Sequence, residues 1–360
     1  MIFPTYFSLV ACLAPLAFAV PTSQPAKRAL PRLGGVNLAG CDFGINTSGS
    51  SAAKGSATCP DSSQISHFVN DGANAIRIPF GWQYITPSWD SPSLSSDFFS
   101  AYDKLVRGVL DAGAYAMIDL HNYARWDGQI VGQGGPTDDN LAAMWTLLAK
   151  KYANDDKVIF GIMNEPHDLD INTWATTVQT SVNAIRAAGA TSQAIALPGT
   201  DYTAVGGWGG GKNDALLAVT DPSHGSDKSL LLIDAHIYLD STSAGTDTEC
   251  THDGTDDLKL LATWLSKNGR KAIISETGGG NTDSCKKYLG QELKYITDNS
   301  NLFAGFTIWS AGAFGSNYEL SITPVNGVDN DLFNTAIKPY LPGYVSLSGR
   351  DGRRMANGAL

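Results

Sequence analysis

The stretch VIFGIMNEPHDL (Val158–Leu169) indicates the fold of this chain and the position of its site. It opens as a run of apolar and β-branched residues, which is the composition of a strand buried on both faces. It then delivers Asn164, Glu165 and Pro166 in succession. A carboxylate is costly to bury unless it is paired or protonated. We therefore interpret the polar end of this run as a functional strand tip.

The backbone at this tip must depart from a regular strand. Adjacent strand residues face opposite sides, so Asn164 and Glu165 can both face one site only if the strand end twists or bulges. Pro166 keeps Glu165 away from helical geometry. We predict a strand over Val158–Met163 with an irregular exit beside Glu165.

Seven similar apolar runs recur along the chain, and segments of helical period lie between them. Helices that alternate with apolar strands indicate βαβ units and a parallel sheet. The other predicted strands are Gly35–Ala39, Ala75–Phe80, Tyr115–Leu120, Ala194–Leu197, Leu230–Ile237, Lys271–Ser275 and Phe303–Trp309. The clearest predicted helices are Asp97–Ala112, Asn140–Tyr152, Thr173–Ala188, Asp257–Asn268 and Cys285–Thr297.

Eight such units in one chain favour an α/β fold of the (β/α)8 (TIM) barrel type, as a single domain. A doubly wound open sheet is the alternative, but the first run reads GGVNLAG and lacks the G-x-G-x-x-G fingerprint. The segment Gly206–Asn213 (GGWGGGKN) matches part of a phosphate-binding loop. It lacks the following Ser or Thr, so we predict a flexible loop on the barrel rim.

The two ends of the chain have the composition of processed or unstructured segments. An apolar run, Phe7–Val20, ends in Ala-Phe-Ala and predicts a signal peptide over residues 1–19. The dibasic pair Lys27-Arg28 predicts a pro-peptide over residues 20–28. We expect the catalytic barrel over residues 29–342 and a disordered tail over residues 343–360.

Composition excludes several classes of partner. The chain has 43% hydrophobic and 17% charged residues and a net charge of −10. Acidic chains repel nucleic acid and anionic membranes, so a neutral substrate fits better. Secretion is expected to pair the four cysteines beyond the leader as near neighbours, Cys41–Cys59 and Cys250–Cys285. A zinc site is the alternative, although no Cys-x-x-Cys spacing occurs. Asn46 begins the single glycosylation sequon that we identify.

Polar residues follow most of the predicted strands, and in a (β/α)8 barrel these ends meet at one face. They are Arg77, His121, Asn122, Asn164, Glu165, His236, Tyr238, Glu276 and Trp309. Asp234, His236 and Tyr238 have the same parity, so a strand points them the same way. Among these strand-end residues, the glutamates are Glu165 and Glu276. Two carboxyl groups at one barrel mouth are the requirement for glycoside hydrolysis.

Five motifs together resemble glycoside hydrolase family 5, and in particular its secreted fungal endo-β-1,4-glucanases (cellulases). They are GIMNEPHD, ISETGGG, DLHNYARW, IDAHIYLD and TIWSAG, and the resemblance covers roughly Gly34 to Leu341. It implies a retaining endoglucanase that acts by double displacement on cellulose or soluble β-glucan. It also implies a cis peptide after Trp309.

The resemblance implies a role for each strand-end residue. Glu165 would be the general acid/base and Glu276 the nucleophile. Asn164 would donate to the sugar 2-hydroxyl, while Arg77 and Tyr238 would hold Glu276 ionised and oriented. His236 would hydrogen-bond near Glu165 or the leaving group. Substrate-binding positions would be His121, Asn122, Trp309 and Trp208, the last as a platform on the rim.

Other functions stay open at this point. The loop Thr200–Tyr202 departs from the amide and tryptophan expected on the leaving-group side, so binding there is undecided. An endo-β-mannanase or other β-glycanase is the first alternative, although the run DLHNYARW resembles the cellulase subgroup. A catalytically dead carbohydrate binder is the second. A metallohydrolase is the third, but His-Glu-x-x-His is missing, and we expect no cofactor or metal. We expect a secreted monomer whose partner is a polysaccharide.

Overall fold

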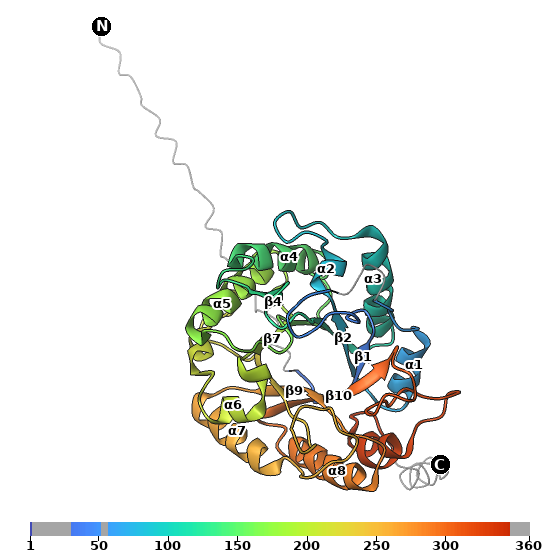
Figure 1. Ribbon diagram of the computed structural model, residues 1–360. Helices are drawn as coiled ribbons and strands as arrows, with labels where there is room; N and C mark the ends of the chain where they lie inside the picture. Colours follow the sequence, from blue (N-terminus) through green and yellow to red (C-terminus); the bar gives the residue numbers. More distant parts are fainter. Residues whose placement is uncertain (2–29, 52–56, 346–360) are drawn as a thin grey trace.

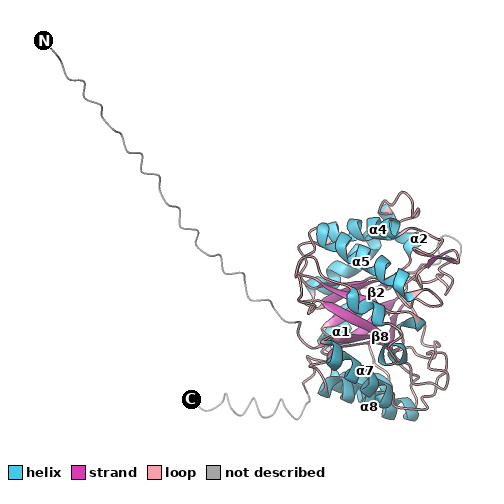
Figure 2. Cartoon of the chain, turned by 90° about the vertical axis from the view of Figure 1, so that its left-hand side faces the viewer, coloured by secondary structure: helices cyan, strands magenta, loops and turns pink. Residues whose placement is uncertain are grey.

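The computed structural model describes Met1, residues 30–51 and residues 57–345. Eight parallel strands close into a barrel in the order β1-β10-β9-β8-β7-β6-β3-β2, which confirms the predicted (β/α)8 fold. The barrel is ringed by helices (Figures 1 and 2). Its strands are β1 Leu33–Ala39, β2 Ala75–Phe80, β3 Tyr115–Leu120, β6 Val158–Gly161, β7 Ala194–Pro198, β8 Leu231–His236, β9 Ala272–Thr277 and β10 Phe303–Gly312.

The helices cover the outside of the barrel, and short elements decorate its loops. In the described part of the chain the α-helices are α1 Ser63–Asn70, α2 Trp82–Ile85, α3 Ser96–Asp111, α4 Asp138–Lys151, α5 Ile171–Ala187, α6 Val205–Gly209, α7 Thr255–Asn268 and α8 Asp283–Asp298. The short elements are the hairpin β4 Arg125–Trp126 with β5 Gln129–Ile130, the 3-10 helices η1 Asp201–Thr203, η2 Asp214–Ala218 and η4 Lys338–Tyr340, and the π-helix η3 Phe333–Ile337. No helix within the described ranges is long and apolar enough to cross a membrane.

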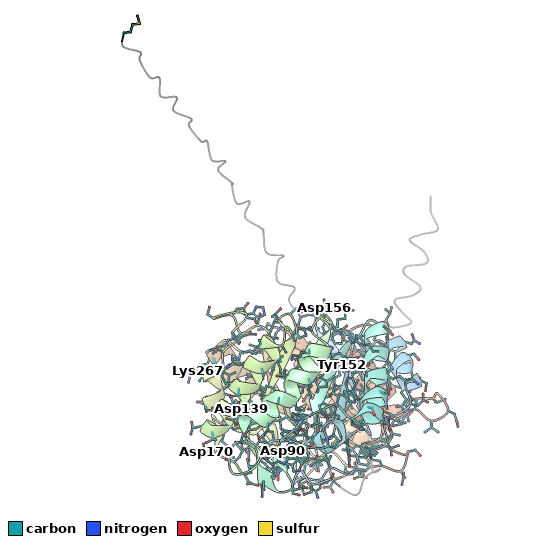
Figure 3. The ribbon with its side chains drawn as sticks, turned by 90° about the horizontal axis from the view of Figure 1, so that it is seen from above. Asp90, Asp139, Tyr152, Asp156, Asp170 and Lys267 are labelled. Carbon is teal, nitrogen blue, oxygen red and sulfur yellow. A yellow bond between two sulfur atoms is a disulfide. The ribbon has the colours of Figure 1, made fainter. Side chains whose placement is uncertain are left out.

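Three long helices begin about two residues earlier than predicted because polar caps start them. The Thr137 hydroxyl accepts from the Asn140 amide and opens α4 in a capping box. Asp170 caps α5, and Thr282 caps α8 in the same way. Charged side chains such as Asp139 lie at the exposed outside of these helices (Figure 3). Apolar periodicity marks only the buried part of each helix and so misses its first turn.

Side chains alternate between the barrel axis and the helices. In β2, Ile76 and Ile78 pack outward against the main core, whereas Ala75 belongs to a separate apolar cluster at the base of the barrel. Arg77, two residues above Ala75, therefore points into the barrel. The same alternation places a layer of buried polar side chains above the apolar base. Its members are Asn37, Arg77, Asp119, Asp234, Ser275 and Thr307.

Two sequence-based expectations about segments of the fold are wrong. Strand β6 ends at Gly161, so Ile162 and Met163 already belong to the irregular exit. The segment predicted as a flexible rim loop includes helix α6, which packs against α7 through the ring pair Trp208–Trp264.

The structure also bears on the predicted disulfides and on the predicted start of the C-terminal tail. Disulfides join Cys41 to Cys59 and Cys250 to Cys285. The Gly343 amide donates to the Gly72 carbonyl, so contact with the barrel continues past residue 342, where the tail was expected to begin. The predicted signal peptide, pro-peptide and most of the tail lie outside the described residues.

Candidate active site

Arg77 lies at the centre of the polar layer. It is fully buried, and its Nη1 donates to Asn37 Oδ1 at 2.8 Å and to Glu276 Oε1 at 2.5 Å. Its Nη2 donates to Asn164 Oδ1 at 2.7 Å and lies 2.9 Å from Asp119 Oδ2. Burial lowers the pKa of Arg77, but the surrounding carboxylates outweigh it and raise that pKa. Side chains from four other strand segments thus converge on one permanent cation.

Glu276 faces the same interior as Ser275 because β9 is irregular there. The pairing of β8 with β9 shifts between Ala235 and His236, which pair with Ile274 and Glu276 respectively. The skipped residue, Ser275, contacts the buried side chains of His236 and Asp234. A bulge therefore allows two consecutive residues to reach one site.

The surroundings of Glu276 favour its anionic form. The Tyr238 hydroxyl donates to Oε2 at 2.7 Å, and His236 Nδ1 lies 3.6 Å from the same oxygen. Burial raises the pKa of Glu276. The positive charges of His236 and Arg77, together with the Tyr238 hydrogen bond, outweigh burial and lower that pKa to about 2. Glu276 is thus held ionised over the ordinary pH range.

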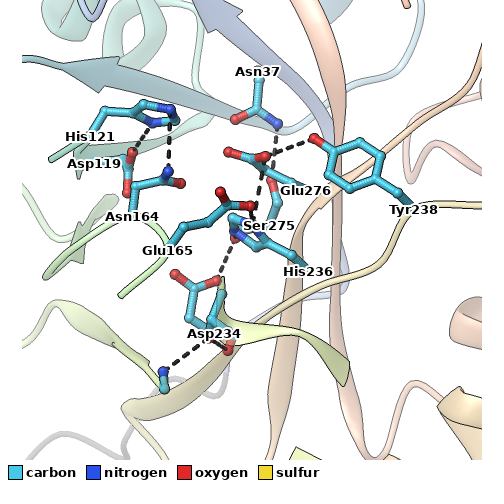
Figure 4. Close-up of polar contacts among 12 residues, drawn as sticks. Asn37, Asp119, His121, Asn164, Glu165, Asp234, His236, Tyr238, Ser275 and Glu276 are labelled. Carbon is cyan, nitrogen blue, oxygen red and sulfur yellow. Dashed lines mark hydrogen bonds and ion pairs between the residues drawn. The ribbon is translucent and has the colours of Figure 1, made fainter. Parts of the chain in front are cut away.

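Glu165 projects from the irregular end of β6 toward His236 (Figure 4). Its Oε1 lies 2.8 Å from His236 Nδ1. Its φ is +44°, in the left-handed region that a residue other than glycine rarely adopts. The preceding Asn164 amide still bonds the Leu120 carbonyl of β3, at 2.7 Å. The chain therefore turns sharply between Asn164 and Pro166, and both polar side chains reach the interior.

His236 links Glu165 to a buried chain of polar groups. Its Nε2 lies 2.9 Å from Ser275 Oγ, and the Ser275 hydroxyl donates to Asp234. Because that hydroxyl proton is committed to Asp234, Nε2 must carry a proton and donate to Ser275. Burial lowers the pKa of His236, but Glu276, Glu165 and Asp234 outweigh burial and raise it. The Nδ1 atom is left to share a proton with Glu165.

Asn164 and His121 orient one another. Arg77 donates to the Asn164 carbonyl oxygen, so the Asn164 NH₂ group faces His121 Nε2, at 3.2 Å. That nitrogen accepts, and the His121 ring proton resides on Nδ1, 3.0 Å from Asp119 Oδ2. The second proton of the Asn164 amide remains available to a ligand.

Aromatic rings form a wall beside Glu276. Trp309 lies nearly parallel to His121, with ring centroids 5.5 Å apart, and its Nε1 donates to the Tyr318 hydroxyl at 3.0 Å. Tyr318 in turn stacks on Phe314 at 4.0 Å. The Trp309–Ser310 peptide is cis. A partly exposed indole face at this position fits the apolar face of a sugar ring.

A second aromatic surface lies on the Glu165 side. His167 and Tyr202 stack with centroids 4.5 Å apart and an interplanar angle of 8°. The Tyr202 amide bonds the Pro166 carbonyl at 2.9 Å, and the side chain is 42% exposed. The unexpected loop Thr200–Tyr202 therefore carries an exposed ring anchored to the Glu165 turn.

Two predicted substrate-binding residues do not face a ligand. Trp208 is fully buried, and its Nε1 donates to the Asp234 carbonyl at 2.9 Å, so it supports β8 instead of forming a rim platform. Asn122 is fully buried as well. Its Oδ1 accepts from the Trp82 amide, and its Nδ2 donates to Gln83 Oε1. Trp208 lies within α6, which packs it between β8 and α7, and Asn122 bonds the first residue of α2.

Sequence reasoning missed several members of the site. Asn37, Asp119 and Ser275 hold Arg77, His121 and His236 respectively. Each is a polar residue inside an otherwise apolar strand, and that pattern was the available signal.

Two clusters within the described residues have the composition of a metal site. In the first, oxygens of Glu165 and Glu276 and a nitrogen of His236 all lie within 4.8 Å of one another. His67, Asp71 and Asp329 form the second, where Lys338 Nζ bonds both aspartates. In the first cluster His236 already contacts both carboxylates, and in the second Lys338 contacts both aspartates. Positive side chains of the protein therefore offset the negative charge in each cluster.

Comparisons with known proteins agree with this geometry. The chain is 54% identical over 342 residues to "Endoglucanase 1" of Saitozyma flava, covering 93% of this chain and 99% of the relative. It is 48% identical over 329 residues to "Manganese dependent endoglucanase Eg5A" of Phanerodontia chrysosporium, covering 90% and 84%. The crystal structure of Cel5A (EG2) from Hypocrea jecorina superposes with a TM-score of 0.81 at 44% identity, covering 86% and 99%.

The family follows from the sequence as a whole. The sequence model of the cellulase family (glycosyl hydrolase family 5) matches residues 36–315, which include the whole Arg77-centred network. This match and the two relatives confirm the resemblance inferred from the five motifs. The chain belongs to the cellulase family, glycosyl hydrolase family 5.

Proposed function

We propose that this protein is a retaining endo-β-1,4-glucanase that hydrolyses internal bonds of cellulose or soluble β-glucan. The single observation that carries the mechanism is the closeness of Glu165 and Glu276, whose nearest oxygens lie within 4.8 Å. Retaining enzymes place their two carboxyl groups roughly 5–5.5 Å apart, whereas inverting enzymes leave roughly 6.5–9.5 Å for a water. The short spacing leaves no room for that water.

In the first step, Glu276 attacks the anomeric carbon and forms a glycosyl ester. Its lowered pKa keeps it ionised, and Arg77 and Tyr238 orient its two oxygens. Glu165 donates its proton to the glycosidic oxygen, so the departing chain leaves as an alcohol. The glycosyl ester is neutral, so the negative charge beside Glu165 is lost.

In the second step, Glu165 takes a proton from water, and the resulting hydroxide releases the sugar from Glu276. Retention follows from two successive inversions at the same carbon. His236 supports both steps because its Nδ1 shares a proton with Glu165 while Nε2 stays bonded to Ser275. The imidazole therefore orients the Glu165 carboxyl group in both of its protonation states.

The reacting sugar would lie between Trp309 and the Asn164–His121 pair. The free Asn164 amide proton faces the position of a 2-hydroxyl, where a hydrogen bond strengthens as charge develops on the ring. Tyr202 would stack on a sugar of the leaving chain. Neutral β-glucan suits an acidic protein whose site offers aromatic faces and hydrogen bonds. The endoglucanase names of both relatives support the same substrate.

Several finer points belong to this proposal. The chain would be secreted after cleavage of residues 1–19 and of a pro-peptide ending at Arg28, and would act as a monomer. Two disulfides fit an oxidising compartment. Asn46 is exposed, with its Oδ1 held by Ser48 and Ser50, and would be glycosylated there. N-terminal sequencing of secreted protein that begins at Val20 would contradict the pro-peptide.

Products of cello-oligosaccharide hydrolysis test the proposal directly. Proton NMR during the first minutes should show the β-anomer of the new reducing end, and product lengths should show internal cleavage. An initial α-anomer would contradict the two-step mechanism. Rates on carboxymethylcellulose and galactomannan separate the glucanase from the alternative endo-β-mannanase. We expect the glucan to be hydrolysed faster.

A further inference from the structure

The loop that follows β8 covers the tyrosine that donates to Glu276. Tyr238 lies two residues beyond His236, the last residue of the strand, so the ladder does not fix its side chain. Gly245 lies directly against the Tyr238 ring, because a Cβ added to Gly245 would come within 2.6 Å of ring atom Cε1. The backbone of the loop is therefore a wall for the ring.

The buried carboxylate of Asp240 holds this loop in shape. Asp240 is 3% exposed, and its Oδ1 accepts from the amides of Ala244 and Gly245 at 3.0 and 3.1 Å. Its Oδ2 accepts from the Thr242 hydroxyl at 2.9 Å and the Thr246 amide at 3.2 Å. Burial raises the pKa of Asp240, but these hydrogen bonds outweigh burial and lower it. An ionised carboxylate thus gathers the loop around itself.

The far end of the loop is attached to the segment that follows the nucleophile strand. The Gly280 amide donates to the Thr248 carbonyl at 3.0 Å, and the Cys250–Cys285 disulfide lies beside it. A Cβ on Gly279 would come within 2.6 Å of both sulfur atoms, and one on Gly280 within 2.3 Å of the Thr248 oxygen. The glycines of ISETGGG therefore permit contact between this segment and the loop.

These contacts form a closed circuit around the nucleophile. Tyr238 contacts the loop that Asp240 holds, and the far end of that loop contacts the Cys250–Cys285 disulfide and the glycines that follow Glu276. The hydrogen bond from the Tyr238 hydroxyl to Glu276 completes the ring of contacts. We propose that Asp240 is a positioning residue of the reaction: it folds residues 241–246 so that Gly245 presses Tyr238 onto Glu276. The proposal rests on the function above only in taking Glu276 as the nucleophile.

The test compares Asp240→Ala with a matched change in the same loop. Asp247 is exposed and bonds the Ser241 hydroxyl, so Asp247→Asn is the control. In Asp240→Ala, kcat should fall about tenfold with little change in KM. The acidic limb of the kcat/KM profile should move to higher pH by about one unit, because Glu276 loses a hydrogen bond to its charged form. The control should keep the wild-type profile.

A double mutant separates positioning from general damage. In a Tyr238→Phe background the hydroxyl is already gone, so Asp240→Ala should no longer move the acidic limb. An equal shift in both backgrounds, or an unmoved limb in folded Asp240→Ala, would overturn the proposal. If Asp240→Ala does not fold by circular dichroism, Gly245→Ala replaces it, because its Cβ pushes the ring directly and should cause the same shift.

A readout without turnover keeps the two proposals distinct. Titration of the Glu276 carboxyl carbon by NMR in isotopically labelled protein reports its ionisation whatever the substrate is. If wild type does not hydrolyse glucan but Asp240→Ala still raises the Glu276 midpoint, the proposed function fails and the positioning role stands. If hydrolysis is retained and the midpoint does not move, only the positioning role fails.

Discussion

The two carboxyl groups at the barrel mouth are held in opposite ways. Glu276 belongs to strand β9, its side chain is 5% exposed, and Arg77 and Tyr238 bond its two oxygens. Glu165 lies beyond the end of β6 with a φ of +44°, its side chain is 19% exposed, and His236 is the hydrogen-bond partner that the described residues give it. Glu276 is enclosed by the protein, whereas Glu165 is partly exposed to water.

This difference matches what each group must do. A nucleophile needs a fixed position and a permanent charge, which burial among cations provides. An acid/base must gain and lose a proton in each cycle, so it needs contact with water and one partner that tolerates both states. The asymmetry between a closed strand residue and an open turn residue therefore separates the two roles more clearly than residue type does.

Replacing either glutamate should cause the largest loss and also separate the roles. Glu276→Gln removes the nucleophile, so hydrolysis of every substrate should fall by about 10⁴-fold or more. Glu165→Gln should cost about 10²–10⁴-fold on cello-oligosaccharides. It should cost far less in the first step on a dinitrophenyl cellobioside, whose leaving group needs no proton. Stopped-flow release of dinitrophenol measures this; equal losses for both variants on that substrate would contradict the assignment.

Weakening the contacts between Arg77 and the enclosed Glu276 should cause the next largest loss of activity. Arg77→Lys keeps a charge but loses the forked contacts to Glu276 and Asn164, so kcat should fall by about 10²–10³-fold. The pKa of Glu276 should rise, which moves the acidic limb of the rate profile to higher pH. Arg186→Lys is the control, because Arg186 is a buried partner of Asp221 outside the site. Its kcat should stay near wild type even if its Tm falls.

Removing the exposed Tyr202 ring, on the Glu165 side of the site, should affect substrate binding more than the chemical step. Tyr202→Ala removes an exposed ring that would stack on the leaving chain, at a cost of roughly 0.5–1.5 kcal/mol. KM for cellopentaose should therefore rise about 2- to 10-fold while kcat changes little. Tyr202→Trp should restore or lower KM. Initial rates over a range of cellopentaose concentrations measure both constants, and a loss confined to kcat would contradict a binding role.

A third glutamate shows what burial does without a cation. Glu292 of α8 is fully buried, accepts from the Thr277 hydroxyl, and has a pKa well above its usual value because of that burial. The folded state therefore retains this proton above the unfolded pKa, near 4.5, and stability is lost as pH rises from there. Glu292→Gln should flatten this loss in Tm between pH 4 and pH 8. Exposed Glu319→Gln is the control and should keep the wild-type slope.

Of all these changes, removal of metal ions should alter the hydrolysis rate least. A cation bridging Glu165 and Glu276 would make the two groups alike, whereas His236 already contacts both. We expect the same hydrolysis rate after dialysis against EDTA as before it. Because one relative is named manganese dependent, the assay should be repeated with added Mn²⁺. A rate that rises with Mn²⁺ and falls with EDTA would show that a metal participates.

Much of the barrel could be predicted because buried parallel strands read as apolar runs. Each of the eight runs overlaps a strand of the barrel, and β2 and β3 have the predicted bounds. The expectation of an irregular exit at Glu165 agrees with its positive φ. What local sequence could not supply is the pairing register. The bulge that turns both Ser275 and Glu276 inward depends on how β8 and β10 pair with β9.

Burial by distant elements explains the wrong assignments in the site. Trp208 and Asn122 follow strands that end at the barrel mouth, as binding residues do. Whether such a side chain meets a ligand depends on how the helices pack: Trp208 lies within α6 and bonds β8, and Asn122 bonds the start of α2. Asn37 and Asp119 were missed for the converse reason. A polar residue within a strand gains a role only once the barrel closes around Arg77.

That dependence on closure has a use in protein engineering. Arg77 collects side chains from β1, β3, the exit of β6 and β9, so its contacts span most of the circumference of the barrel. In a circular permutant the original ends are joined and new termini are made in an outer loop, so this centre would form again only when the two strands on either side of the new termini take their places in the barrel. Hydrolysis of a chromogenic glucan would then report ring closure in each colony, without any biophysical measurement.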